Sequence, residues 1–366
     1  MVSFTIFAGG YTNFIASYLF NSNNSSLSLL QQFPTGPNPS WITAHPTNPR
    51  VLYAVNEVQS GALQSFDISS TGVLSNPVDT VSSGGDSPAH VVPLSDGEVA
   101  IMNYSGGNGR IIATAGSPEL FDPSAAVITF PPPIGGVSHP HMTLQHGDEV
   151  FVPDLGGDKI WRLVRNGAPG NWKIQGLIAQ PQGSGPRHLA IHGNSLYTLH
   201  ELASTLTVQA IPPAPNGTSP IVDSVSIIPP NPPAGALWAA GEILIPQPTA
   251  KFPVPYIYVS NRNTGVQGPQ GDSIAIFEHV PATVRTRESL KLVTQVFTGL
   301  DQVRGMEFGP ASVGGEEFLV ASGVAGTGGV VIYRRTDGGR NLVEVARNSD
   351  IPTRTSFVWS TLVPAY

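Results

Sequence analysis

The sequence has no cysteine, little charge and no long hydrophobic run. The lack of cysteine excludes disulfides, zinc–thiolate sites and thiol nucleophiles, and it fits a reducing compartment. Only 12% of the residues are charged and the formal net charge is −7, so the basic footprint of a nucleic-acid-binding protein is missing. No apolar stretch approaches the roughly 18 residues of a membrane helix. We therefore expect neither a nucleic-acid partner nor a membrane span.

The segment Met1–Phe20 differs from a secretory leader. It has no basic start, Gly9-Gly10 interrupts it, and its apolar residues alternate as they do in a strand. We therefore expect a cytoplasmic protein. The sequence carries no signal for an oligomeric state.

Turn-forming residues are abundant instead. Glycine (40) and proline (35) make up about a fifth of the 366 residues, and 40% of the chain is hydrophobic. Helical periodicity is not apparent over a useful length. Frequent turns between short apolar runs are typical of an all-β protein, and a chain of this length can bury a large core.

One pattern recurs along the chain: a proline, an apolar run, a turn, a second apolar run and then a conspicuous polar residue. Four copies begin at Pro39, Pro88, Pro140 and Pro186, and two looser copies begin at Ala240 and Val303. The copies end at positions 57, 104, 154, 201, 262 and 323, which lie 47 to 61 residues apart. This period suits a four-stranded propeller blade.

The two ends of the chain supply one further blade. Thr353–Val363 is expected to form its inner strand, beside strands from Phe4–Tyr11 and Ser17–Leu30. Closing the ring in this way removes open sheet edges. The sequence thus predicts an all-β, seven-bladed β-propeller with four-stranded blades and a closing blade shared between the N- and C-termini, as a single domain over residues 1–366.

The repeat also predicts where polar side chains gather, because the inner strand of every blade lines the central channel. The residue after each leading proline, or its equivalent, forms a first ring: Ser40, Ala89, His141, Arg187 and Arg304. The residue that ends each second apolar run forms a second ring: Glu57, Tyr104, Asp154, Glu201 and Arg262. Only a short hairpin separates the two positions in each copy, so both rings are expected at one end of the channel.

The chemistry of the rings favours an acidic substrate. Guanidinium groups bind carboxylate and phosphate oxygens bidentately, and a histidine or glutamate beside them can move a proton. Structural interpretations stay open: an arginine at a strand end can form a surface ion pair, His188 or His90 can be a satisfied core group, and Glu57 or Asp154 can hold blades together. Polar residues at the same repeat position in successive copies favour the functional interpretation.

Motifs of other enzyme classes are missing, and two metal sites are open alternatives. There is no Gly-x-Ser-x-Gly elbow, and His200-Glu201 lacks the second histidine of a zinc-protease helix. His139 and His141 could offer two imidazoles to a metal, although a proline separates them. Three ring carboxylates could instead hold a hard cation: Glu57, Asp154 and Glu201.

Several short segments resemble the seven-bladed lactonase family, which includes the propeller-type 6-phosphogluconolactonases of bacteria and the fungal carboxy-cis,cis-muconate cyclases. The resemblance extends from Gly9 to Trp359 and rests on Ala54–Glu57, Asn103–Gly107, Ser138–His141, Gly183–His188 and Ser260–Arg262. The cyclase branch implies a metal-free and cofactor-free active site of His141, Arg187, Glu201 and Arg262. The chain length is similar to that of the cyclases, whereas the residues within the individual motifs are more similar to those of the phosphogluconolactonases.

The leading hypothesis from the sequence is a lactonising isomerase that converts 3-carboxy-cis,cis-muconate to its muconolactone. Arg187 and Arg262 would clamp substrate carboxylates. His141 or Glu201 would move the carbon-bound proton, and the favoured assignment is His141 as general acid with Glu201 tuning it. Further contacts to the small carboxylate or lactone substrate are expected from Glu57, Tyr104, Asp154, Arg304 and His188. Two alternatives remain: hydrolysis of a sugar lactone such as 6-phosphogluconolactone, and a non-catalytic propeller that binds small acids or a partner.

Overall fold

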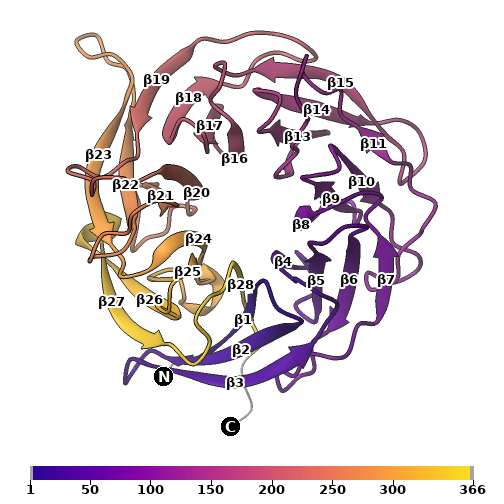
Figure 1. Cartoon of the computed structure of the whole chain (residues 1–366), viewed down its shortest axis with the longest axis horizontal. Coiled ribbons are helices and arrows are strands. Elements are labelled where there is room, and N and C mark those ends of the chain that lie inside the picture. Colours follow the sequence, from indigo (N-terminus) through magenta and orange to yellow (C-terminus); the bar gives the residue numbers. More distant parts are fainter. Residues whose placement is uncertain (1–2, 363–366) are drawn as a thin grey trace.

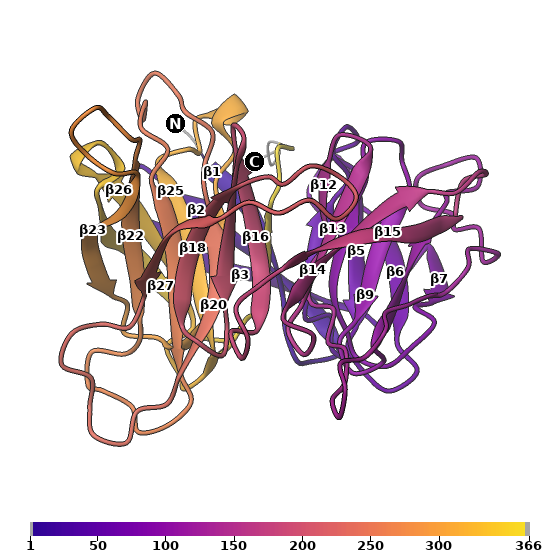
Figure 2. The same cartoon turned by 90° about the horizontal axis from the view of Figure 1, so that it is seen from above.

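A computed structural model describes residues 3–362 as seven four-stranded antiparallel sheets arranged around a central axis (Figure 1). The predicted all-β, seven-bladed propeller is confirmed. Figure 2 shows the ring edge-on, with the strands running between its two faces. Within the described part of the chain, no helix has the length and hydropathy needed to span a bilayer.

The closing blade joins both ends of the chain, as predicted. From the axis outward it contains β28 (Ser356–Trp359), β1 (Ser3–Gly9), β2 (Phe14–Asn21) and β3 (Ser26–Pro34). Strands β28 and β1 are antiparallel, with Trp359 opposite Ile6 and Ser356 opposite Gly9. The last residue of the predicted inner strand, Val363, lies outside the described residues.

The other six blades each use four consecutive strands, and two 3-10 turns interrupt the last one. In chain order the strands are β4 (Ile42–Ala44), β5 (Val51–Asn56), β6 (Ala62–Asp67), β7 (Asp79–Ser82); β8 (Pro88–Pro93), β9 (Val99–Asn103), β10 (Asn108–Ile112), β11 (Ile128–Thr129); β12 (Leu144–His146), β13 (Glu149–Asp154), β14 (Lys159–Arg165), β15 (Trp172–Ala179). They continue as β16 (Pro186–His192), β17 (Ser195–His200), β18 (Thr205–Ala210), β19 (Ile221–Ser226); β20 (Trp238–Leu244), β21 (Ile257–Asn263), β22 (Ser273–Val280), β23 (Ser289–Phe297); β24 (Asp301–Phe308), β25 (Phe318–Ala325), β26 (Val330–Thr336), β27 (Asn341–Asn348). The 3-10 turns are η1 (Ala311–Val313) and η2 (Asp337–Gly339).

The hydrophobic core lies between neighbouring blades. Phe4, Phe20 and Trp359 of the closing blade pack together with Phe318 of β25 in one buried cluster. The ring centroids of Phe20 and Phe318 are 4.8 Å apart in an edge-to-face arrangement. Because each cluster of this kind is shared by two sheets, side-chain packing holds the blades at fixed angles and leaves the inner strands to present polar side chains to the axis.

Four of the seven inner strands share an irregularity that positions part of the site. Their pairing with the second strand shifts register between Pro88 and His90, between Pro186 and His188, between Ala240 and Ile243, and between Val303 and Gly305. A β-bulge re-aims the extra residue and interrupts the ladder there. Three of the bulged residues, Ala89, Arg187 and Arg304, belong to the predicted first ring. The repeated bulge therefore gives these three positions of the ring a structural basis.

Candidate active site

Arg187 and Arg262 share the carboxylate of Glu201. Arg187 Nη1 pairs with Glu201 Oε2, and Arg262 Nη2 lies 2.8 Å from Glu201 Oε1. The Nε atoms donate to two consecutive backbone carbonyls of β20, since Arg187 Nε lies 2.8 Å from Gly241 O and Arg262 Nε lies 3.0 Å from Ala240 O. A carboxylate between two guanidiniums that are also anchored at the backbone is a rigid anion-binding frame.

The charges of this frame persist near neutral pH. Burial raises the pKa of Glu201, but Arg187 and Arg262 outweigh it and lower that pKa to about 2. Burial and the neighbouring Arg187 lower the pKa of Arg262 to about 10. Glu201 is therefore ionised at working pH, so it acts as an ion-pair partner and not as a proton donor.

A second ion-pair group surrounds Glu57. Tyr11 donates its hydroxyl proton to this carboxylate, with Tyr11 Oη 3.1 and 3.0 Å from Glu57 Oε1 and Oε2, and Ser40 Oγ donates to Oε2. Arg304 Nη2 lies 3.5 Å from Glu57 Oε2, and its guanidinium carbon is 5.2 Å from the centre of the Tyr11 ring. Burial raises the pKa of Tyr11 to about 12, so its phenol stays a donor. Arg304 also acts electrostatically on Glu201, which places the two groups in one site.

His141 begins a buried line of three polar side chains. Its Nδ1 lies 3.2 Å from His188 Nε2, and His188 Nδ1 lies 2.7 Å from Glu242 Oε1. Burial and the charge of Arg187 lower the pKa of both histidines well below 6.5. Burial also raises the pKa of Glu242 to about 8. At neutral pH the line is therefore a chain of neutral hydrogen bonds, and the close contact of His188 with Glu242 is not an ion pair.

Tyr104 lies against two imidazoles. Its ring stacks on His139 at a centroid distance of 4.4 Å and meets His141 edge-on at 5.6 Å. Burial, then the charge of Glu201, raises the pKa of Tyr104, so its hydroxyl stays protonated. A phenol beside both His141 and the charged groups can donate a hydrogen bond to a developing oxyanion.

Asp154 has a different environment from the other ring residues. It has no exposed surface. Its two carboxylate oxygens accept four hydrogen bonds. Oδ1 accepts from His139 N (2.7 Å) and Gly157 N (2.9 Å), and Oδ2 accepts from Ser138 Oγ (2.7 Å) and Trp161 Nε1 (2.9 Å). These donors tie the hairpin after β13 to the segment before β12. The structure therefore gives Asp154 a structural environment within its own blade.

The three carboxylates considered for a hard cation have separate partners. Glu57 pairs with Arg304, Glu201 with two other arginines, and Asp154 with N–H and O–H donors. Among residues 3–362, no group of three or more histidine, aspartate or glutamate side chains could hold a metal ion. His139 Nδ1 contacts Tyr104 O at 2.8 Å, and His141 Nδ1 faces His188, so these two nitrogens have protein partners.

Two members of the site were missed in the sequence. Glu242 lies in the fifth repeat copy, which has no leading proline; the register shift between Ala240 and Ile243 brings it to the position that His188 occupies in the preceding blade. Tyr11 precedes the first copy, in the segment after β1. A search for polar residues one position beyond each bulge would have found Glu242, whereas no repeat signal marks Tyr11.

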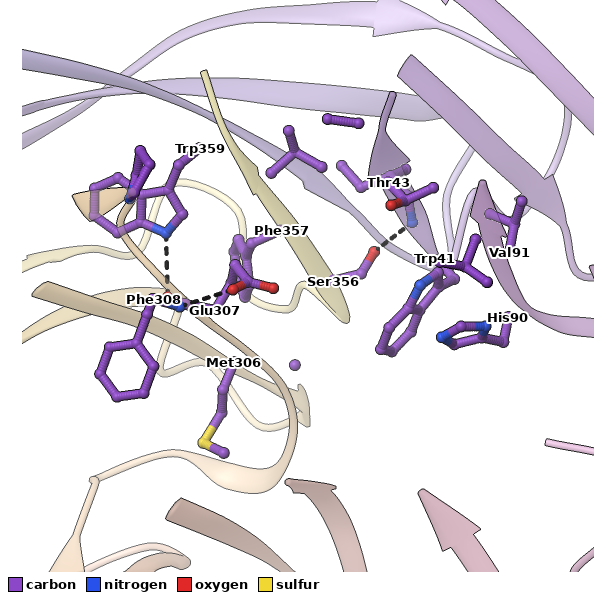
Figure 3. Close-up of a pocket in the computed structure, with 16 residues that line it drawn as sticks. Trp41, Thr43, His90, Val91, Met306, Glu307, Phe308, Ser356, Phe357 and Trp359 are labelled. Atoms are coloured by element: carbon purple, nitrogen blue, oxygen red, sulfur yellow. Dashed lines mark hydrogen bonds between the residues drawn. The ribbon is translucent and has the colours of Figure 1, made fainter. Parts of the chain in front are cut away.

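A cavity of about 360 Å³ lies along the inner strands of four blades (Figure 3). It is lined by β4 and the residue before it, by β28, and by the parts of β8 and β24 that follow their bulged residues. Its walls include Trp41, Phe308, Phe357 and Trp359. His90 and Glu307 add polar groups, and burial together with Glu242 raises the pKa of Glu307 to about 8. The ring centroids of Trp41 and His90 are 4.7 Å apart in a tilted arrangement, and those of Trp41 and His188 are 5.4 Å apart in an edge-to-face arrangement.

Comparisons with known proteins agree with this architecture. A family model described as "Lactonase, 7-bladed beta-propeller" matches residues 5–359. Similar solved structures include a periplasmic gluconolactonase of Pseudomonas aeruginosa (19% identity, 99% of this chain and 100% of that chain, TM-score 0.80). Another is a Bacteroides fragilis protein described provisionally as a 6-phosphogluconolactonase (20% identity, 98% of each chain, TM-score 0.78). At these low sequence identities, the similarity to the two structures is a similarity of fold. No curated protein matches the sequence.

Proposed function

Because this chain belongs to the seven-bladed β-propeller lactonase family, we propose that it hydrolyses an anionic lactone at the site of His141, Arg187, Glu201, Arg262 and Arg304. The family match supports an enzyme that acts on small lactones. The choice of hydrolysis and of an anionic substrate rests on the chemistry of the site.

The unprotonated state of His141 carries the proposal. Its pKa lies well below 6.5 because of burial and the nearby charges of Arg187 and Arg304. No hydrogen bond within residues 3–362 engages its Nε2, while Nδ1 contacts His188. A neutral imidazole with one free nitrogen is a general base for water.

The proposed reaction uses one proton carrier. His141 takes a proton from water as the water oxygen attacks the lactone carbonyl carbon. Arg187, Arg262 and the Tyr104 hydroxyl stabilise the oxyanion of the tetrahedral intermediate. The ring C–O bond then breaks, and the imidazolium returns its proton to the departing alkoxide oxygen. The product is a hydroxy acid, and Glu201 stays ionised throughout.

The arginines support an anionic substrate. Arg187, Arg262 and Arg304 face two carboxylates, Glu201 and Glu57, so the charged groups of the site leave one positive charge in excess. A phosphate or carboxylate on the lactone would compensate that charge. We assign this anion to Arg304, because its pairing distance to Glu57 is 3.5 Å and leaves the guanidinium less tightly engaged than Arg262.

Cycloisomerisation of carboxymuconate, the leading hypothesis from the sequence, is the second candidate. The quartet of His141, Arg187, Glu201 and Arg262 favours it, because two guanidiniums could bind two substrate carboxylates. The reaction in the lactonising direction needs a proton donor to carbon, and neither neutral His141 nor ionised Glu201 is a good donor at neutral pH. This difference supports hydrolysis as the first choice.

Two assays distinguish the candidates. Release of acid from 6-phosphogluconolactone and glucono-δ-lactone, corrected for spontaneous hydrolysis, should accelerate with the protein and favour the phosphorylated lactone. Loss of diene absorbance from 3-carboxy-cis,cis-muconate without lactone hydrolysis would instead establish the isomerase. No turnover of any of these compounds, with binding retained, would indicate a non-catalytic propeller.

A further inference from the structure

Two buried side chains behind His141 have no part in the proposed reaction. His188 is fully buried and Glu242 is 3% exposed, and both sit one position beyond the bulge of their inner strands, in neighbouring blades. Burying a carboxyl and an imidazole away from water is costly unless they are hydrogen-bonded. Their contacts form one continuous line to His141: Glu242 Oε1 to His188 Nδ1 at 2.7 Å, and His188 Nε2 to His141 Nδ1 at 3.2 Å.

A backbone N–H group determines which atoms donate and which accept in this line of hydrogen bonds. Glu242 Oε1 accepts the N–H of Ile243 at 2.9 Å. It therefore serves as the carbonyl-type oxygen of the carboxyl group, since a hydroxyl oxygen of a carboxylic acid is the poorer acceptor. Glu242 Oε2 is buried and has no hydrogen-bond partner among the described residues, which leaves it to carry the proton when the group is neutral. Oε1 must then accept from His188 as well.

The acceptor role of Glu242 then determines the donor and acceptor nitrogens of both imidazole rings. A neutral imidazole has one N–H and one bare nitrogen, and the hydrogen bond at one nitrogen decides the state of the other. If His188 donates from Nδ1 to Glu242, its Nε2 is bare and must accept. The donor to that atom is Nδ1 of His141, and the Nε2 of His141 is left with its lone pair.

We propose that Glu242 and His188 are positioning residues that hold His141 in the Nδ1–H tautomer, with Nε2 bare and available as the base. The base role rests on the proposed function, whereas the tautomer does not. Glu242 acts here as a neutral hydrogen-bond acceptor. It thus differs from the ionised aspartate of a serine-protease triad, which stabilises an imidazolium by charge.

The electrostatic surroundings are consistent with a neutral line. Charged or titratable groups acting on its three members from other elements are Arg187, Glu201, Arg262, Arg304, His90 and Glu307. The arginines disfavour a second proton on either histidine. Burial keeps the carboxyl of Glu242 protonated up to a pH of about 8.

Two substitutions at one position separate hydrogen bonding from charge. Glu242→Gln keeps an acceptor oxygen for both Ile243 and His188 and carries no charge, so it mimics the protonated acid. Glu242→Met keeps the approximate length of the side chain and removes the acceptor. A matched control is Glu307→Gln, which also replaces a carboxyl of raised pKa but faces the aromatic cavity.

The test combines ¹⁵N NMR of histidine-labelled protein with assays of lactone hydrolysis. The His141 signals are assigned by their disappearance in His141→Asn, and the His188 signals by their disappearance in His188→Asn. We expect His141 to show protonated Nδ1 and bare Nε2 in the wild type, in Glu242→Gln and in Glu307→Gln, and a mixture of tautomers in Glu242→Met. We expect kcat to fall about 10- to 100-fold in Glu242→Met with KM little changed, and to stay within about threefold of wild type in the other two.

Distinct results separate the two proposals. A protonated Nε2 on His141 in the wild type would overturn the assignment, and this measurement remains decisive even if Glu242→Met does not fold. Equal losses of kcat in Glu242→Gln and Glu242→Met would also overturn it, because charge would then be the active property. If the tautomer is as expected but no lactone is hydrolysed, the positioning inference stands and the proposed function fails.

Discussion

Arg262 Nη2 lies 2.8 Å from Oε1 of Glu201, whose other oxygen pairs with Arg187. One carboxylate thus neutralises part of the charge of two buried guanidiniums and fixes their spacing. Breaking a buried ion pair by removing one partner leaves an uncompensated charge, which commonly costs about 3–5 kcal/mol. Glu201 therefore supports both the stability of the protein and the geometry of its anion site.

Lowering the pH should reduce the free energy of unfolding through protonation of Glu201. Its pKa is about 2 in the folded state and close to 4.5 when unfolded, so ionised Glu201 contributes stability above pH 4.5 that is lost as the pH falls toward 2. The shift corresponds to about 3 kcal/mol. Urea unfolding at several pH values should show a shallower decline between pH 5 and pH 3 for Glu201→Gln than for the wild type. Parallel curves for the two proteins would contradict this assignment.

Arg304 should select the charge of the substrate. Replacing it with glutamine removes the guanidinium assigned to the phosphate or carboxylate and leaves the Arg187–Glu201–Arg262 frame in place. We expect KM for 6-phosphogluconolactone to rise about 10- to 100-fold, with a change of less than about threefold in kcat/KM for neutral glucono-δ-lactone. Steady-state kinetics with both lactones measure the difference. An equal effect on both substrates would show that Arg304 does not bind the anion.

The pH dependence of hydrolysis should report His141. Burial and the neighbouring arginines lower its pKa well below 6.5, and the base is active when unprotonated. The log of kcat/KM should therefore be level from pH 6.5 to 7.5 and fall only as the pH drops through this lowered pKa. A falling limb centred at or above pH 6.5 would be inconsistent with a base in this environment.

Asp154 should matter for stability more than for substrate binding. Its carboxylate accepts four hydrogen bonds and has no exposed surface. Asp154→Asn places an N–H₂ where donors already point, which should cost about 2–3 kcal/mol of unfolding free energy. KM should change less than about threefold. A large increase in KM with unchanged stability would return Asp154 to the substrate-binding group.

The repeat was sufficient to predict the fold and several of the polar side chains that the structure brings together. The blade period and the split closing blade follow from the spacing of short apolar runs. The position after Pro186, and its equivalent after Val303, coincide with the bulges that hold Arg187 and Arg304. Glu242 was missed because its copy lacks the leading proline, so that the position of its one-residue bulge is not marked in the sequence. Asp154 occupies the same repeat position as Glu201, yet the two carboxylates meet different partners, N–H and O–H groups in one case and guanidiniums in the other. Such differences depend on side chains from neighbouring segments, which a repeat position does not specify.

Hydrolysis of 6-phosphogluconolactone at pH 7 by the wild type and by His141→Gln tests the central claim most directly. The substitution removes the base while keeping a polar side chain, and thermal unfolding of both proteins controls for folding. After subtraction of spontaneous hydrolysis, we expect clear acceleration by the wild type and a loss of at least about 100-fold in kcat for the variant. Equal rates for the two folded proteins, or no acceleration by either, would contradict the account.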